Sequence, residues 1–119
     1  MFGRRDSRDT QRALRFFKER RIAVQYVDVA VKPPAPTELR RFTERLGVGA
    51  LVDTGSRRYR DLGLGYLTMG DGELFERLIA DPALLRLPLV RRGSEVAAGA
   101  DEPAWRGVVA SVRAAEGGR

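Results

Sequence analysis

The 119-residue chain contains no cysteine and no histidine. The lack of cysteine excludes disulfides, thiolate catalysis and cysteine-ligated zinc or iron–sulfur sites. The lack of histidine removes the commonest general base and metal ligand. Any catalysis would therefore have to rest on carboxylates, hydroxyls or arginines, and we expect neither a metal nor another cofactor.

Long apolar runs are also missing. No stretch approaches the roughly 20 apolar residues that a membrane span needs, and the N-terminus lacks the apolar segment of a secretion signal. With 43% hydrophobic and 32% charged residues, the composition is that of one ordinary globular domain over residues 1–119. We expect a cytoplasmic protein that does not associate with membranes.

Lysine is scarce among the basic residues, of which 20 are arginine and two are lysine. The 16 acidic residues leave a net charge of +6, and such a charge can attract polyanions. Acidic residues are interspersed almost throughout, however, and aromatic residues do not alternate with the basic ones. We therefore do not expect a nucleic acid partner.

The first 30 residues read as a strand, a helix and a second strand. The only candidate for the first strand is Met1–Gly3, so either the true start lies upstream or the strand is clipped. A helix is expected over 9–20, with Ala13, Phe16 and Phe17 on its buried face. The β-branched run Ala23–Val29 predicts a buried strand that pairs in parallel with the first.

Two further helices and a hairpin are predicted next. Three prolines within 33–36 form an extended linker, after which a helix near 37–46 should bury Leu39, Phe42 and Leu46. Glycines interrupt residues 49–72. The pattern there does not indicate a regular helix or strand, and only a turn at 53–56 is expected. A helix over 73–80, a short turn through 82–85 and a hairpin formed by 87–91 and 95–98 complete this part.

The last element is a helix capped by Asp101. Trp105, Val108, Val109 and Val112 recur at helical spacing and predict its apolar stripe. Residues 115–119 are expected to be a frayed tail.

The loop between the first strand and the first helix is the best candidate for a binding site. Free backbone N–H groups and the positive end of the helix dipole favour an anion at a helix start. Ser7 stands at this point, with Arg8 and Arg12 close to it in sequence. The pattern predicts a shallow site for a small oxyanion.

The stretch from Phe2 to Ala13 resembles the active-site loop of the ArsC/Spx family, the arsenate reductase-like branch of the thioredoxin superfamily. Phe2-Gly3 matches its start and Ala13 its end, while Ser7 takes the position of the nucleophilic cysteine and Thr10 that of the second redox cysteine. The resemblance implies a thioredoxin-like, ArsC-type α/β fold. That fold has a mixed sheet, flanking helices and a helical insertion in the order β-α-β-α-α-β-β-α.

Other segments carry the same resemblance. Residues 51–53 and 59–62 match the family's Leu-Leu-Asn and Tyr-Arg-x-Leu, and 81–90 resembles its Asn-Pro-x-Leu-Ile-x-Arg-Pro-Val/Ile-Leu. The resemblance implies a cis peptide bond before Pro88 and an oxyanion-contacting arginine near the middle segment. The candidates for that arginine are Arg57, Arg58 and Arg60, which can equally be ordinary exposed loop residues.

The departures from the family pattern concern function. The arginine that precedes the family's conserved proline is Leu87 here, and a serine cannot pass through the sulfenyl and disulfide states of arsenate reduction. We therefore expect an arsenate reductase-like protein without the redox cysteine. It would be non-catalytic and would bind a protein, with RNA polymerase implied by the Spx relatives. The alternative is an oxyanion-handling reductase or transferase that uses Ser7, nearby arginines and an external thiol.

Overall fold

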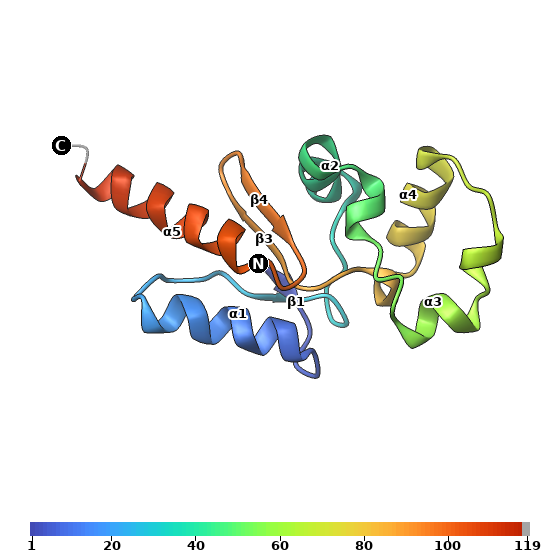
Figure 1. The fold of residues 1–119 in the computed structure, drawn as a ribbon, viewed down its shortest axis with the longest axis horizontal. Helices are drawn as coiled ribbons and strands as arrows, with labels where there is room; N and C mark the ends of the chain where they lie inside the picture. The colour runs from blue at the N-terminus through green and yellow to red at the C-terminus, as the bar shows by residue number, and fades with distance from the viewer. Residues whose placement is uncertain (118–119) are drawn as a thin grey trace.

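The computed structural model describes residues 1–117 and has a four-stranded sheet with helices on both faces (Figure 1). The molecule measures 51 × 27 × 24 Å along its principal axes. The elements are, in chain order, β1 Phe2–Gly3, α1 Arg8–Glu19, β2 Val27–Asp28, α2 Pro36–Leu46, α3 Arg57–Asp61, α4 Asp71–Ala80, β3 Leu89–Arg92, β4 Glu95–Ala98 and α5 Glu102–Gly117, with short 3-10 turns at Val48–Leu51, Leu64–Tyr66 and Pro82–Leu84.

The sheet is mixed, with the strand order β2-β1-β3-β4. β1 pairs in parallel with β2, placing Phe2 opposite Val27, and it pairs antiparallel with β3, placing Phe2 opposite Leu89. β3 and β4 form the predicted hairpin, closed by Gly93 and Ser94. The mixed sheet with flanking helices and a helical insertion that was expected from the sequence is confirmed.

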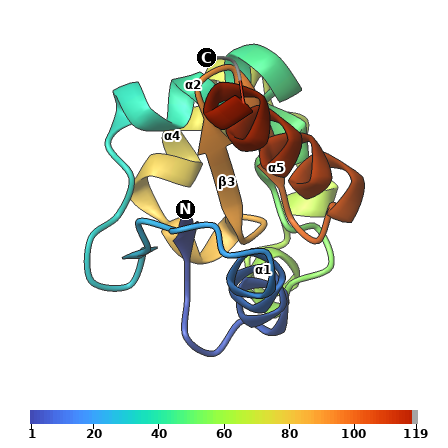
Figure 2. The same cartoon turned by 90° about the vertical axis from the view of Figure 1, so that its left-hand side faces the viewer.

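Helices α1 and α5 cover one face of the sheet, as the end-on view shows (Figure 2). Their aromatic side chains meet there, because Phe16 and Phe17 of α1 both pack against the fully buried Trp105 of α5. Val90 of β3 and Ala97 of β4 point into the same cluster. The predicted core roles of Phe16, Phe17 and Trp105 are confirmed.

The opposite face is covered by α2, by α4 and by the segments that connect them. Leu39 and Phe42 of α2 pack with Leu78 of α4 and Leu89 of β3 in one apolar cluster. Adjacent residues Leu89 and Val90 of β3 thus face different layers, as the alternation of a strand requires. The two clusters together form the core.

Two expectations, for the second strand and for α2, were wrong in part. Only Val27–Asp28 of the predicted strand 23–29 is paired, because β1 offers partners at Phe2 and Gly3 alone. Leu46 is 36% exposed, because the apolar cluster that holds Leu39 and Phe42 ends before the last turn of α2.

The segment 49–72 is more regular than its glycines suggested. After the expected turn at 53–56, Ser56 caps α3 by accepting a hydrogen bond from the Tyr59 backbone N–H at 3.1 Å. At the other end of the chain, α5 continues to Gly117, since Ala114, Ala115 and Glu116 favour helix. The predicted frayed tail is therefore helical over 115–117, and 118–119 lie outside the described residues.

Other predictions agree with the structure. Asp101 Oδ1 accepts a hydrogen bond from the Ala104 N–H at 3.2 Å and so caps α5. The Leu87–Pro88 peptide bond is cis, as the family resemblance implied. Among the described residues, no helix has both the length and the apolar character that crossing a membrane requires.

Candidate functional site

Ser7 is the N-cap of α1. Its backbone is extended and its Oγ accepts a hydrogen bond from the Thr10 N–H at 3.1 Å. This bond satisfies one of the donors that the first helical turn leaves free. Because Oγ is the acceptor in this bond, the hydroxyl hydrogen remains able to donate to a ligand.

An open hollow of about 380 Å³ lies beside Ser7. It is lined by Arg5, Asp6, Ser7, Arg8, Gln11, Arg12 and Arg15. Four arginines against one aspartate make the hollow positively charged. The sequence-predicted residues Ser7, Arg8 and Arg12 are therefore neighbours in the structure.

The two predicted arginines of the hollow differ in their partners. Arg12 Nη2 lies 3.2 Å from Glu102 Oε2 of α5, and its guanidinium lies 5.9 Å from the centre of the Trp105 ring. Within residues 1–117, Arg8 forms no ion pair, and its side chain is exposed. Arg8 is the better placed of the two for contact with an anion.

Thr10, which the sequence resemblance aligned with the family's second cysteine, is completely buried. Its Oγ1 accepts a hydrogen bond from the Arg4 N–H at 3.4 Å, and its side chain packs against Gly3. Thr10 therefore joins the loop to the sheet and is closed to solvent.

Gly3 also lies close to the Tyr26 ring. Burial, followed by the charge of Asp28, raises the pKa of the Tyr26 hydroxyl.

The three other candidate arginines belong to α3 and do not line the hollow. Arg58 Nε is held 2.6 Å from Asp81 Oδ2, and Arg57 Nε lies 3.8 Å from Asp61 Oδ2. Arg60 donates a hydrogen bond to the Gly55 carbonyl at 3.4 Å. Each of these side chains thus has a local partner.

The residues before Pro88 also lie outside the hollow. Leu87 is 7% exposed and belongs to the apolar cluster beneath α2 and α4. Arg86 donates a hydrogen bond to the Val52 carbonyl at 3.4 Å, and its methylene groups lie against Gly99. Arg86 therefore lies in a different environment from Leu87, because neighbouring side chains of an extended segment point to opposite sides.

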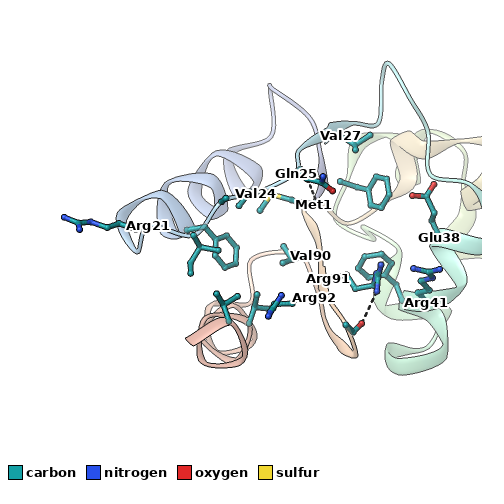
Figure 3. A pocket seen from close by; sticks show the side chains of 18 of the residues that line it. Met1, Arg21, Val24, Gln25, Val27, Glu38, Arg41, Val90, Arg91 and Arg92 are labelled. Carbon is teal, nitrogen blue, oxygen red and sulfur yellow. Dashed lines mark hydrogen bonds between the residues drawn. The ribbon is translucent and has the colours of Figure 1, made fainter. Parts of the chain in front are cut away.

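The sequence interpretation missed the larger concave feature, a cleft of about 670 Å³ at the other end of α1 (Figure 3). It extends from Arg21 and Val24 to Val90 and Arg92 of β3, and Met1 is among its lining residues. No single motif in the sequence indicated it, because its lining comes from several segments that lie far apart in the chain.

Comparison with known proteins is consistent with the geometry. The model of the ArsC family matches residues 5–108. Among solved structures, the protein YFFB has a TM-score of 0.82 at 16% identity, with coverage of 91% of this chain and 96% of that one. A Bacteroides fragilis protein described as ArsC family related has a TM-score of 0.81 at 22% identity, with coverage of 90% and 95%.

An arsenate reductase from Vibrio cholerae has a TM-score of 0.74 at 23% identity, covering 88% of this chain and 90% of that one. At these identities the structural likeness establishes the fold alone. No match was found among the curated proteins. Since the family model spans most of the chain, from the helix-start loop into the first half of α5, this protein belongs to the ArsC family.

Proposed function

We propose that this ArsC-family protein has lost thiol redox chemistry and works by binding another protein. The observation that carries the proposal is the environment of Ser7 and Thr10, the two residues that the resemblance aligns with the family's cysteines. Ser7 serves as a helix cap, and Thr10 is completely buried against Gly3. Both residues have structural roles that need no redox chemistry.

The chemistry of oxygen supports the proposal. The thiol-based reduction of arsenate in ArsC enzymes needs a sulfur that can pass through an adduct and a disulfide. A hydroxyl is also a poor nucleophile without an adjacent base, and the chain has no histidine to act as one. Leu87, buried in the core, cannot hold an oxyanion in place of the family's arginine.

RNA polymerase is the first partner to test, because Spx-type members of the family contact it and their cysteine pair is a switch separate from that surface. A member without the switch can keep the surface. The net charge of +6 predicts that binding depends on exposed arginines and weakens with salt. A cytoplasmic location is part of this proposal.

The test is affinity capture from an extract of the source cell with the immobilised protein, probed for RNA polymerase subunits. We expect capture that falls as salt is raised and is the same with dithiothreitol or peroxide. Capture that requires peroxide would contradict the proposal, as would the absence of the polymerase at every salt concentration. A Ser7→Ala variant is the matched control, since the loss of one hydroxyl should leave capture unchanged.

A second candidate function, oxyanion handling with an external thiol, is favoured by the positively charged hollow beside Ser7. Its first requirement is that the hollow binds sulfate, phosphate or arsenate at millimolar concentration. Titration of the isotopically labelled protein, followed by the amide NMR signals of Ser7 to Gln11, tests that requirement. Shifts confined to this loop, reduced in an Arg8→Gln variant, would support the candidate.

A further inference from the structure

β4 forms one edge of the sheet, because the strand order is β2-β1-β3-β4. Where the hairpin joins α5, the Gly99 N–H donates a hydrogen bond to the Pro88 carbonyl at 3.0 Å. Hydrogen-bonded and non-hydrogen-bonded pairs alternate along an antiparallel ladder, so the backbone N–H and C=O groups of Val96 and Ala98 point away from β3. Within residues 1–117, β4 pairs with β3 alone, which leaves these groups unpaired at the outer edge of the sheet.

Both faces of β4 are packed against helices. Ala97 belongs to the apolar cluster of α1 and α5, while Val96 and Ala98 pack against the cluster of α2 and α4. The ribbon view accordingly shows the hairpin between α5 and α2 (Figure 1). Val96 and Ala98 nevertheless keep part of their surface exposed, and Glu95 is exposed. The edge is therefore supported on both faces and remains in part accessible.

The edge carries few of the features that prevent pairing. An unpaired edge is a template for another strand, and proteins usually protect such edges with proline, lysine or a bulge. Residues 95–98 read Glu-Val-Ala-Ala, and each of them lies opposite one residue of β3 without interruption. The single charge on this edge is that of Glu95. Such a regular edge favours pairing with a further strand.

The edge is also complementary to itself. If β4 of a second copy runs antiparallel to it about a two-fold axis at Ala97, Val96 of each copy lies opposite Ala98 of the other. These are the residues whose N–H and C=O groups point outward, so each pair exchanges hydrogen bonds as an antiparallel ladder requires. A two-fold contact of this kind uses the same surface on both copies and closes after two.

The same register brings opposite charges together, because it places Glu95 opposite Gly99 of the second copy. The methylene groups of Arg86 lie against Gly99, since a Cβ atom placed on Gly99 would be 2.7 Å from Arg86 Cδ. Within residues 1–117, Glu95 forms no ion pair, even with Arg92 opposite it in the hairpin, and Arg86 forms none either. Both side chains are exposed. Each copy thus offers the other a carboxylate and a guanidinium that are complementary in charge.

We propose that two copies of the chain associate through β4, so that their sheets join into one sheet across a two-fold axis at Ala97. Val96 and Ala98 form the backbone ladder, and Glu95 of each copy forms an ion pair with Arg86 of the other. A strand from another protein would make the same backbone bonds, but the reciprocal match of Glu95 with Arg86 is specific to a second copy. The inference goes beyond the protein-binding function proposed above, because it holds whichever partner the protein binds.

Analytical ultracentrifugation over about a hundredfold range of protein concentration tests the association. We expect a reversible equilibrium between monomer and dimer, because a short strand pair makes a small interface. Amide hydrogen exchange, measured by NMR on the unchanged chain, locates the contact. Exchange of the Val96 and Ala98 N–H groups should slow as dimers form. Exchange of the Asp28 N–H, in β2 at the opposite edge of the sheet, should not change.

Charge reversal tests the register. In Glu95→Arg the new arginine meets Arg86 of the other copy, and in Arg86→Glu two carboxylates meet. Each variant alone should therefore dimerise about tenfold more weakly than the original chain. In an equimolar mixture of the two variants every contact again joins opposite charges, so dimers should form. Lys32→Glu makes the same change of charge at an exposed position near β2 and should leave dimerisation unchanged.

A monomer at every concentration would overturn the inference. Dimers that leave the exchange of Val96 and Ala98 unchanged would place the contact elsewhere and overturn it as well. Variants that stay monomeric when mixed, although each is folded by circular dichroism, would contradict the register of Glu95 with Arg86. Rescue by mixing distinguishes a charge contact from a folding defect, and the exchange measurement needs no variant.

Discussion

Gly3 of β1 and Thr10 of α1 are in direct contact. A Cβ atom placed on Gly3 would lie 2.8 Å from Thr10 Oγ1, closer still to Thr10 Cγ2, and 3.1 Å from the Tyr26 ring. The glycine therefore allows the strand, the helix and the completely buried Thr10 to approach closely. Thr10 is therefore a packing residue in this structure.

Gly3→Ala should destabilise the protein by about 1–3 kcal/mol, the usual effect of overpacking a core. Urea unfolding measures the change. The double variant Gly3→Ala/Thr10→Ala should lose less stability than the sum of the two single variants, because Thr10→Ala removes the clashing atoms. Additive losses would contradict the proposed contact.

The contact between Gly3 and Thr10 could not be predicted from the sequence, although both positions stood out in the motif. Hydrophobic periodicity and turn residues predicted the order of the elements apart from α3, and they predicted the role of Phe17. The number of paired residues in β2 could not be predicted. A strand pairs only where its neighbour offers residues, and β1 offers only Phe2 and Gly3.

Arg21 is the one non-glycine residue with positive φ among the described residues, at 59°. It occupies the left-handed position after α1, where the Ile22 N–H bonds to the Phe17 carbonyl at 2.9 Å and the Arg21 N–H to the Lys18 carbonyl at 3.0 Å. This is the Schellman arrangement that glycine favours. Arg21→Gly should therefore raise the free energy of unfolding by about 0.5–1 kcal/mol.

Arg21→Ala is the control for that prediction. It removes the long side chain but keeps a Cβ atom in the left-handed region, so it should show none of the gain. Thermal unfolding of both variants measures the difference. Equal stability of the glycine and alanine variants would mean that the backbone at Arg21 is not strained.

The amino group of Met1 predicts a dependence of stability on pH. Its pKa is lowered below the ordinary value of 8.0 by burial and by Arg91, with Glu38 opposing. Between the lowered pKa and 8.0 the unfolded chain binds more protons, so stability should rise with pH through this window. The chain has no histidine or cysteine that titrates there.

Acetylation of the Met1 amino group removes its titration. Urea unfolding between pH 6 and 8 should show a rise in stability for the free amine that is absent from the acetylated protein. Parallel curves for the two forms would show that the amino group has its ordinary pKa in the folded protein.

Ser7→Cys tests the electrostatics of the helix start. The N–H groups of the first turn and the arginines of the hollow should lower the pKa of the new thiol below the free value of about 8.5. Titration of the thiolate absorbance in the ultraviolet gives this pKa. A value at or above that of free cysteine would mean that the loop keeps the backbone shape of the family without its anion site.

The most direct test of the central claim is an assay of arsenate reduction by the purified protein with glutathione and glutaredoxin. Ser7 caps a helix and Thr10 is buried, and no residue of the chain can form a thiol adduct. The account predicts a rate equal to that of the reaction without protein. Turnover above that background would contradict it and would favour the alternative in which Ser7 and nearby arginines act with an external thiol.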